Sequence, residues 1–284
     1  MFCIAAAVGL GAVGAAGEEC ASPAPRTLRT AMAQIEIIDG DLAENMRRAE
    51  EAIRKAAKQG AKLVCLPEAA DFGWLYQKAR EDALPIPGKY THMLSGLARE
   101  LDIWISAGCL EKDGEHVYNS AVLINRGGEV VLKHRKIDTL PFLTAHLYDC
   151  GYHADIKTVD TEFGRVGITI CADNFNHDNP KRAAELGAWL LIAPHGFAAD
   201  EDEMEKNARD FQNHISGVAK ATGMWVIGTD AVLGRVAGGE WEGKLHSGVS
   251  TISNPQGENV AVGKFKKPDL VLYDIEIGGP AEEN

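Results

Sequence analysis

The sequence predicts an α/β protein, because apolar runs of strand length alternate with amphipathic helical segments in two successive rounds. Hydrophobic residues make up 45% and charged residues 25% of the 284 positions, which is typical of a soluble globular chain with a large core. No stretch within residues 27–284 has the composition of a linker, so we predict one domain over that range. Residues 1–26 are predicted to be a separate apolar leader that ends in a Pro-containing segment.

The first round begins with a predicted strand over residues 30–38, followed by a turn and helix cap at residues 39–41. Residues 59–60 end the next helix, and residues 61–66 form a second strand that leads into Pro67 and Glu68. Strand, helix and strand in this order imply two parallel strands. Apolar residues at steps of three and four define the buried side of the helix: Leu42, Met46, Ala49, Ile53 and Ala56.

The alternation continues with a predicted helix over residues 90–101 and a strand over residues 103–109. Two further strands, residues 117–125 and 129–134, flank an Arg-Gly-Gly segment at residues 126–128. A short Gly-containing connection between two apolar runs predicts a hairpin.

The second round starts with a buried strand over residues 164–170, which ends at Cys171. A helix is predicted next, then a strand, a long helix and another strand, and the tail is rich in strands. The predicted elements are a helix at 180–186, a strand at 189–193, a helix at 200–222, and strands at 224–228, 248–252, 259–262 and 270–277.

Three chemically reactive side chains directly follow predicted strands: Glu68, Lys136 and Cys171. Each has a commoner explanation on its own, namely a solvated residue or helix cap, a solvated basic face, and a packed thiol. The carboxyl ends of strands in an open α/β sheet border one crevice, however, so we expect the three to meet. A glutamate can take the thiol proton and later protonate a leaving amine. A lysine can stabilise an oxyanion and lower the thiol pKa.

Three segments of the chain resemble, in order, the glutamate, lysine and nucleophile segments of the nitrilase superfamily of carbon–nitrogen hydrolases. They are Leu66-Pro67-Glu68, Tyr118-Asn119-Ser120 through His134-Arg135-Lys136, and Gly164-Arg165-Val166-Gly167 through Cys171-x-Asp173. Similarity extends over about residues 28–277 and includes Leu186-Gly187-Ala188, Gly248-x-Ser250, Asn254-Pro255-x-Gly257 and Asp274-Ile275.

The resemblance implies a four-layer α-β-β-α sandwich that assembles as a homodimer or a higher homo-oligomer. It also implies a thiol hydrolase acting on a small amide through a Cys171 thioester, with Glu68, Lys136 and Cys171 as the triad. The backbone N–H of Ala172 would share the oxyanion with Lys136. Nitrile hydrolysis by the same triad, or an inactive family member that serves as a binding or scaffold protein, are the alternatives.

The chain departs from the family pattern at two positions that bear on substrate. A second glutamate of many relatives is missing between the lysine and cysteine segments, where Asp149 is the nearest acid. The arginine that many relatives carry four residues after the cysteine is replaced by Phe175, which makes an N-carbamoyl amino acid a weaker candidate. Asp149, one carbon shorter than a glutamate, is the candidate for the second acid, and the alternative is that the chain has none.

A substrate side group is expected to rest beyond the strand ends, beside aromatic residues. Phe72, Trp74, Asn174, Phe175 and His195 are the candidate substrate-binding residues. Core packing is the alternative explanation for the aromatic members of this set.

The net charge of −12 argues against nucleic acid or anionic membranes as partners. A Gly9-x-Gly11-x-x-Gly14 match to a dinucleotide fingerprint is rejected, because Pro23 and Pro25 break the chain where a helix should follow. We expect no cofactor and no metal. The competing hypothesis is a metallohydrolase built from His146, Asp149, Cys150 and His153, with His177 and His195 elsewhere, although this spacing matches no zinc pattern.

Residues 1–17 carry no charged side chain and resemble a secretory signal peptide that lacks its basic start. If the leader is cleaved, the mature chain begins near Glu18, is exported or periplasmic, and has no membrane segment. If this stretch is a tail or a misplaced start, the protein is cytoplasmic. Cleavage would leave five of the six cysteines, so at least one thiol would be unpaired.

Overall fold

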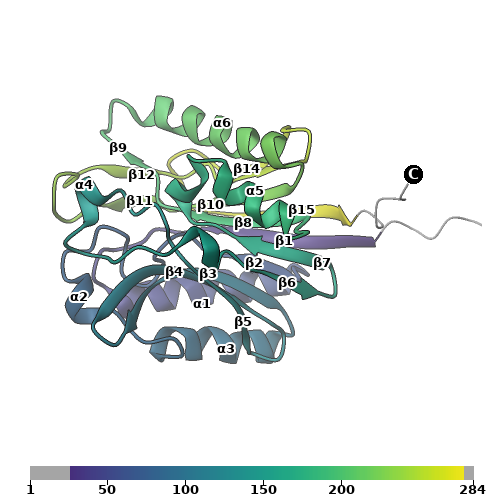
Figure 1. The fold of residues 1–284 in the computed structure, drawn as a ribbon, viewed down its shortest axis with the longest axis horizontal. Coiled ribbons are helices and arrows are strands. Elements are labelled where there is room, and N and C mark those ends of the chain that lie inside the picture. Colours follow the sequence, from purple (N-terminus) through teal and green to yellow (C-terminus); the bar gives the residue numbers. More distant parts are fainter. Residues whose placement is uncertain (1–25, 278–284) are drawn as a thin grey trace, which may run out of the picture.

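A computed structural model describes residues 26–277 and contains two six-stranded sheets packed face to face, with helices on both outer faces (Figure 1). This arrangement is the four-layer α-β-β-α sandwich that was expected. The predicted leader, its cleavage position and two of the cysteines lie outside the described residues.

The first sheet has the order β15-β1-β2-β3-β4-β5, and the second has the order β14-β13-β10-β8-β7-β6. The first comprises β15 (Asp269–Ile277), β1 (Arg26–Gln34), β2 (Leu63–Cys65), β3 (Trp104–Asp113), β4 (His116–Ile124) and β5 (Val130–Arg135). The second comprises β14 (Asn259–Val262), β13 (Thr251–Ser253), β10 (Trp225–Asp230), β8 (Leu190–His195), β7 (Gly164–Ile168) and β6 (Thr158–Thr161). A small third sheet joins β11 (Val232–Arg235), β12 (Leu245–Ser247) and β9 (Ala198–Ala199).

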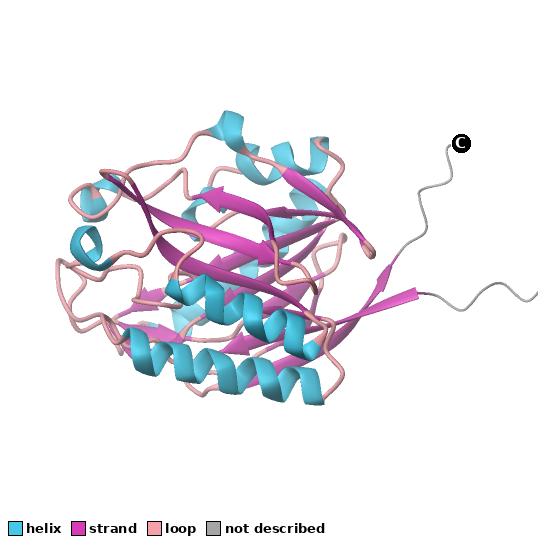
Figure 2. Cartoon of the chain, turned by 90° about the horizontal axis from the view of Figure 1, so that it is seen from below, coloured by secondary structure: helices cyan, strands magenta, loops and turns pink. Residues whose placement is uncertain are grey.

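Helices α1 (Leu42–Lys58) and α3 (Lys89–Leu101) lie side by side over the outer face of the first sheet (Figure 2). The Asp41 carboxylate caps α1 by accepting the Glu44 N–H at 3.0 Å. Helices α5 (Asp178–Glu185) and α6 (Met204–Thr222) cover the second sheet. The shorter helices are α2 (Ala79–Asp82), α4 (Pro141–Thr144), η1 (His153–Asp155) and η2 (Cys171–Asn174).

Apolar side chains from both sheets interdigitate between them and form the central core. Met32, Leu63 and Leu123 of the first sheet pack with Ile168 and Ile192 of the second, and all five are buried. Burying one such side chain fully contributes about 1.5–3 kcal/mol, so this layer fixes how the two sheets face each other. The strands that end at Glu68, Lys136 and Cys171 come from both sheets, and this packing therefore sets the positions of the three residues relative to one another.

The carboxyl ends of the strands converge because of the strand directions. Strands β1, β2 and β3 are parallel, and β5 runs in the same sense because β4 is antiparallel to both of its neighbours. Strands β7, β8 and β10 are parallel in the second sheet.

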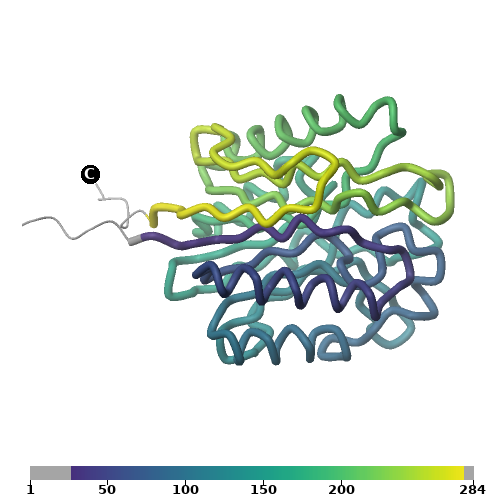
Figure 3. Tube along the Cα trace, turned by 180° about the vertical axis from the view of Figure 1, so that it is seen from behind, coloured from purple at the N-terminus to yellow at the C-terminus, as the bar shows by residue number. Residues whose placement is uncertain are grey.

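The structure differs from the expected strands in two places. Strand β1 starts at Arg26, because it pairs along its length with β15 from the other end of the chain (Figure 3). The strand expected over residues 248–252 begins only at Thr251, as β13, since Gly248 and Val249 adopt positive φ angles of 75° and 64°. No helix within residues 26–277 is long and apolar enough to cross a membrane.

Candidate active site

Glu68, Lys136 and Cys171 follow the carboxyl ends of β2, β5 and β7, and the structure brings them together between the two sheets. All three are nearly inaccessible to solvent, with exposed fractions of 2%, 1% and 5%. A buried carboxyl, amine and thiol in contact shift one another's pKa values, and such clusters are typical of acid–base active sites.

The backbone around Glu68 is held by both sheets. Its N–H donates to the His195 carbonyl of the second sheet at 3.2 Å, while Ala70 N–H donates to the Gly108 carbonyl of β3 at 3.0 Å. A methyl group on Gly108 would lie 2.6 Å from Glu68 Cα, so the loop can cross β3 this closely only over a glycine.

The two oxygens of the Glu68 carboxylate have different surroundings. Oε1 accepts hydrogen bonds from Lys136 Nζ at 2.6 Å and Asn119 Nδ2 at 2.8 Å. Oε2 is buried and has no partner among the described residues. The carboxylate is therefore anchored through one oxygen, and the other is available to a proton or a ligand.

Lys136 keeps its charge although it is buried. Burial alone would lower its pKa, but the Glu68 carboxylate and the Cys171 sulfur outweigh this and raise the pKa above the ordinary lysine value. A permanent ammonium is thus fixed next to the sulfur.

Cys171 opens the 3₁₀ turn η2 with a φ of 45°, a conformation that non-glycine residues rarely adopt. Burial, and then the Glu68 charge, raise the pKa of its thiol well above the ordinary value; Lys136 and the Gly196 N–H act in the opposite direction without prevailing. The lowering effect of lysine that the sequence suggested is outweighed here. A thiol whose pKa is raised needs a base for its attack on a substrate.

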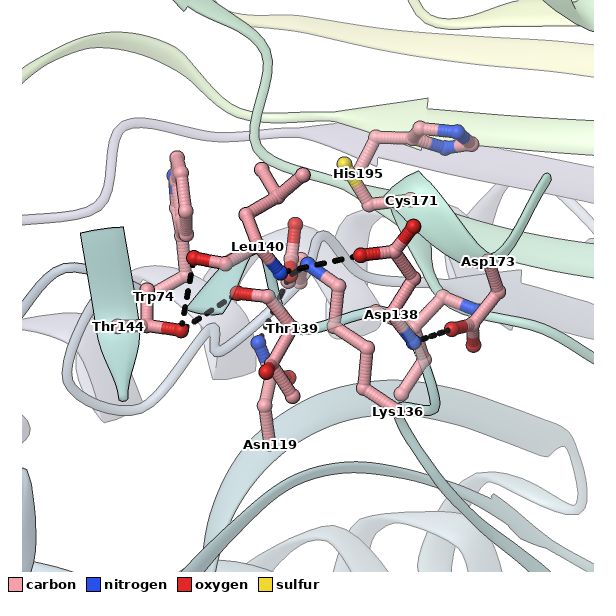
Figure 4. A network of polar contacts seen from close by, with 12 residues as sticks. Trp74, Asn119, Lys136, Asp138, Thr139, Leu140, Thr144, Cys171, Asp173 and His195 are labelled. Carbon is pink, nitrogen blue, oxygen red and sulfur yellow. Dashed lines mark hydrogen bonds and ion pairs between the residues drawn. The ribbon is translucent and has the colours of Figure 1, made fainter. Parts of the chain in front are cut away.

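Asp173 ties the cysteine turn to the lysine loop across the two sheets (Figure 4). It is completely buried. Its Oδ1 accepts the N–H groups of Ile137 and Asp138, each at 2.8 Å, and its Oδ2 accepts the Ile170 N–H at 2.9 Å and His134 Nε2 at 2.8 Å. One saturated carboxylate thereby sets the position of Cys171 relative to Lys136.

The turn after β8 lies beside the sulfur, and the Gly196 N–H lowers the pKa of the Cys171 thiol. The next N–H, from Phe197, donates to Asp230 Oδ1 at 2.8 Å, and Asp230 Oδ2 is buried without a partner in the described chain. Burial raises the pKa of Asp230 well above its ordinary value. Asp230 thus holds the turn that contacts the nucleophile.

Trp74 lies at the site, and its ring centre is 5.3 Å from Lys136 Nζ. Its indole Nε1 is buried and has no partner within residues 26–277. Phe72 instead stacks on Tyr76 with ring centres 5.5 Å apart and belongs to a neighbouring apolar cluster.

His195 and Phe175 belong to an aromatic cluster beside the site. His195 is buried and contacts Phe197 and Phe211, and burial lowers its pKa well below the ordinary value. Phe175 covers His214 at 5.0 Å between ring centres and remains 52% exposed. His195 is therefore a neutral inner residue of the cluster, and Phe175 lies on its rim.

Two expected site residues have other partners. The buried Asn174 side chain accepts from Thr169 Oγ1 at 2.7 Å and donates to the Cys171 carbonyl at 3.2 Å, so it braces the turn rather than facing a substrate. The Asp149 carboxylate bonds Arg80 and the Val117 N–H, at 3.2 and 3.0 Å, rather than Lys136. The Asp149 side chain is partly exposed and paired with Arg80 at the surface. It therefore does not serve as a second acid beside Lys136.

Asn119 and Asp230 also belong to the site, although neither is among the residues predicted from the sequence. Asn119 was only part of a motif, although it follows the pattern of a polar residue inside an apolar strand. Asp230 ends the apolar strand β10, which is the same signal that identified Glu68. In the described chain, no group of three or more His, Cys, Asp or Glu residues is arranged to hold a metal ion.

The fold and these strand-end residues define a hydrolase of the nitrilase type, and comparison with known sequences agrees. The profile described as carbon-nitrogen hydrolase matches residues 29–279. The chain therefore belongs to the carbon–nitrogen hydrolase family and is an enzyme of that class.

Among curated relatives, human omega-amidase NIT2 is 30% identical over 276 residues, covering 90% of this chain and 91% of that protein. A nitrilase of Pyrococcus abyssi is 29% identical and covers 82% of this chain and 84% of its own length. Among solved structures, an amidase from Nesterenkonia sp. AN1 superposes with a TM-score of 0.75 at 19% identity, covering 89% of this chain and 92% of that one. Nit3 of Saccharomyces cerevisiae has a TM-score of 0.74 at 21% identity, covering 88% and 90%.

Proposed function

We propose that this enzyme is a thiol-dependent amidase, in which Cys171 attacks the carbonyl carbon of a small amide and Glu68 accepts its proton. The observation that carries the proposal is the divided Glu68 carboxylate, with Oε1 anchored by Lys136 and Asn119 and Oε2 unpartnered. A base needs one oxygen held in place and one oxygen open to the proton that it moves.

The reaction then follows from the positions of the charges. Attack produces a tetrahedral oxyanion, which the Lys136 ammonium and the N–H of Ala172 stabilise. Ala172 lies in the first turn of η2, where N–H groups lack an earlier helical carbonyl to bond. Glu68 passes the thiol proton to the departing nitrogen, the C–N bond breaks, and a thioester on Cys171 remains. Glu68 then takes a proton from water, which hydrolyses the thioester.

Buried acceptors favour an amide over a nitrile as substrate. Glu68 Oε2 and Asn119 Oδ1 are both buried acceptors without partners among the described residues. The nitrogen of a primary amide offers two N–H donors, whereas a nitrile offers none. Amidase activity is also supported by the omega-amidase relatives. A cysteine nucleophile is supported by the Nesterenkonia amidase, a mutant of which shows covalent addition of the acetamide moiety of fluoroacetamide at the active-site cysteine.

The test is ammonia release from short aliphatic and aromatic amides, nitriles and N-carbamoyl compounds. Cys171→Ala should lower amide hydrolysis by at least ~10⁴-fold, because the parts of a covalent triad act as a unit. Cys150→Ala is the matched control, since Cys150 is a free, exposed thiol outside the proposed machinery, and this variant should keep its activity. Chelators should have no effect.

Hydrolysis that survives Cys171→Ala but is lost to a chelator would support the metallohydrolase hypothesis. A well-folded wild-type protein that hydrolyses none of these compounds would support the inactive, binding form of the family instead.

A further inference from the structure

Two unpartnered polar atoms of the site face one another across Gly196. Trp74 Nε1 and Glu68 Oε2 are both buried, and neither has a hydrogen-bond partner in the described part of the chain. Trp74 is 4% exposed and Glu68 2% exposed, so bulk solvent does not satisfy them. Buried polar groups are rarely left unpaired in folded proteins, and such a pair indicates a place for a bound molecule.

The glycine position locates that place. A methyl group built on Gly196 would lie 2.8 Å from Trp74 Nε1 and 3.3 Å from Glu68 Oε2. The N–H of the same glycine acts on the Cys171 thiol and lowers its pKa. The indole N–H and the free carboxylate oxygen therefore lie at most about 6 Å apart, both beside the glycine that neighbours the nucleophile.

The chemistry of the two atoms limits what can bind between them. An indole N–H can only donate, and an ionised carboxylate can only accept. Their shared ligand must therefore accept one hydrogen bond and donate another. A primary amide can do so only with two separate atoms, its carbonyl oxygen as acceptor and its nitrogen as donor, and it has been consumed once the thioester forms. Water meets both requirements, and so does the ammonia that leaves before it.

We propose that Trp74 Nε1 and Glu68 Oε2 together bind the water that hydrolyses the Cys171 thioester. This role rests on the proposed amidase mechanism and adds Trp74 to its catalytic residues. One lone pair of the water accepts the indole N–H, one hydrogen points to Glu68 Oε2, and the second lone pair is free to attack the thioester carbon. The water proton passes to Glu68 as the C–O bond forms. The C–S bond then breaks, the sulfur leaves with its electron pair and takes that proton, and the carboxylic acid departs.

The indole is held firmly enough to orient a water. Tyr148 Oη donates to the backbone carbonyl of Trp74. Trp241 packs edge-on against the Trp74 ring, with 5.7 Å between the ring centres. Lys136 Nζ lies 5.3 Å from the centre of the Trp74 ring. A donor fixed in this way costs little reorganisation when the water attacks.

The test separates the two chemical steps by rapid quenching and mass spectrometry of the enzyme during turnover. Trp74→Phe keeps an aromatic ring beside Lys136 but removes the N–H donor. We expect thioester hydrolysis to slow by about 10-fold, the effect of losing one hydrogen bond, while the acylation rate stays within about 2-fold. Acylated Cys171 should then accumulate.

Trp225→Phe is the matched control, because it makes the same exchange at a tryptophan that packs on Tyr273 of β15; it should not accumulate acyl enzyme. Site-specific replacement of Trp74 by benzothienylalanine keeps the bicyclic shape without the N–H, and it decides the matter if Trp74→Phe fails to fold. Wild-type thioester hydrolysis in both Trp74 variants would overturn the inference and leave the amidase proposal standing. Turnover by wild type without any acyl Cys171 would overturn the amidase mechanism itself.

Discussion

Two buried glutamates on neighbouring strands of the first sheet have opposite surroundings. Glu111 of β3 is 2% exposed, and both of its oxygens are bonded: to Ser120 Oγ at 2.6 Å, to Arg135 at 2.6 and 3.0 Å, and to Lys133. Glu68 is equally buried, yet it uses only one oxygen. The saturated carboxylate joins strands, whereas the incompletely bonded one keeps an acceptor for chemistry.

The pleat of β5 separates these two clusters. Side chains alternate between the faces of a strand, so Lys133 and Arg135 reach Glu111 while His134 and Lys136 reach the interface between the sheets. Four consecutive basic residues therefore serve two unrelated purposes.

The largest effects should come from exchanging the two glutamates for glutamine. Glu68→Gln should lower kcat by about 10³–10⁴-fold, because it removes the base but keeps the shape. It should also lower the unfolding free energy by about 3 kcal/mol, because it leaves the Lys136 ammonium buried without its counter-charge. Glu111→Gln should lower the unfolding free energy by about 3 kcal/mol and leave kcat within a few fold, because it breaks a buried ion cluster. Kinetics and urea titration of both variants test this, and an active Glu68→Gln enzyme would contradict the assignment.

Lys136 and Lys133 should also differ, because only the loss of Lys136 should lower kcat strongly. Lys136→Met is expected to reduce kcat by about 10²–10³-fold, since it removes the positive charge beside the oxyanion. Lys133 is partly exposed and remote from the sulfur, so Lys133→Met should change kcat less than 2-fold. If both variants lose kcat equally in steady-state assays, the two lysines affect activity only through the stability of the fold, and Lys136 has no special role at the site.

Buried aspartates extend the comparison, because Asp173 is saturated and Asp230 is not. Asp173→Asn would turn an N–H₂ group toward backbone donors, and we expect a loss of about 2 kcal/mol in unfolding free energy. Slower alkylation of Cys171 by iodoacetamide should accompany it, because the turn is no longer fixed. An unchanged alkylation rate would show that Asp173 does not position the nucleophile.

The last prediction concerns Asp230 and the pH dependence of stability. A carboxyl whose pKa is raised on folding adds stability while protonated; this contribution is complete below the unfolded pKa and is lost as pH rises through the folded pKa. Asp230→Asn keeps an acceptor for the Phe197 N–H but cannot ionise. Relative to wild type, its unfolding free energy should therefore improve with rising pH, by up to about 1.4 kcal/mol per pH unit above pH 4. Parallel stability curves for the two proteins would contradict the raised pKa.

Short-range patterns predicted much of this fold, and long-range pairings account for most of what they missed. The helix over residues 42–58 and the hairpin between β4 and β5 follow from periodicity and turn chemistry. The start of β1 depends on pairing with β15 more than 200 residues away. The third sheet depends on similar contacts, and its short strands carry no clear periodicity.

For the site, strand-end positions identified Glu68, Lys136 and Cys171 as residues that would meet, because parallel strands end at one edge. Side-chain direction within loops was not predictable. Asn174 turns inward to brace η2, and Asp149 turns outward to Arg80, although both lie near reactive residues in the sequence. Hydrogen-bond saturation, which separates Glu68 from Glu111, exists only in three dimensions.

The most direct test of the central claim is the mass of the Cys171 peptide from enzyme quenched during turnover of a good amide substrate. The account predicts an increase equal to the acyl group of that substrate, confined to Cys171, which disappears when the substrate is exhausted and never forms in Cys171→Ala. Sustained hydrolysis with no adduct, together with an active Cys171→Ala enzyme, would contradict it.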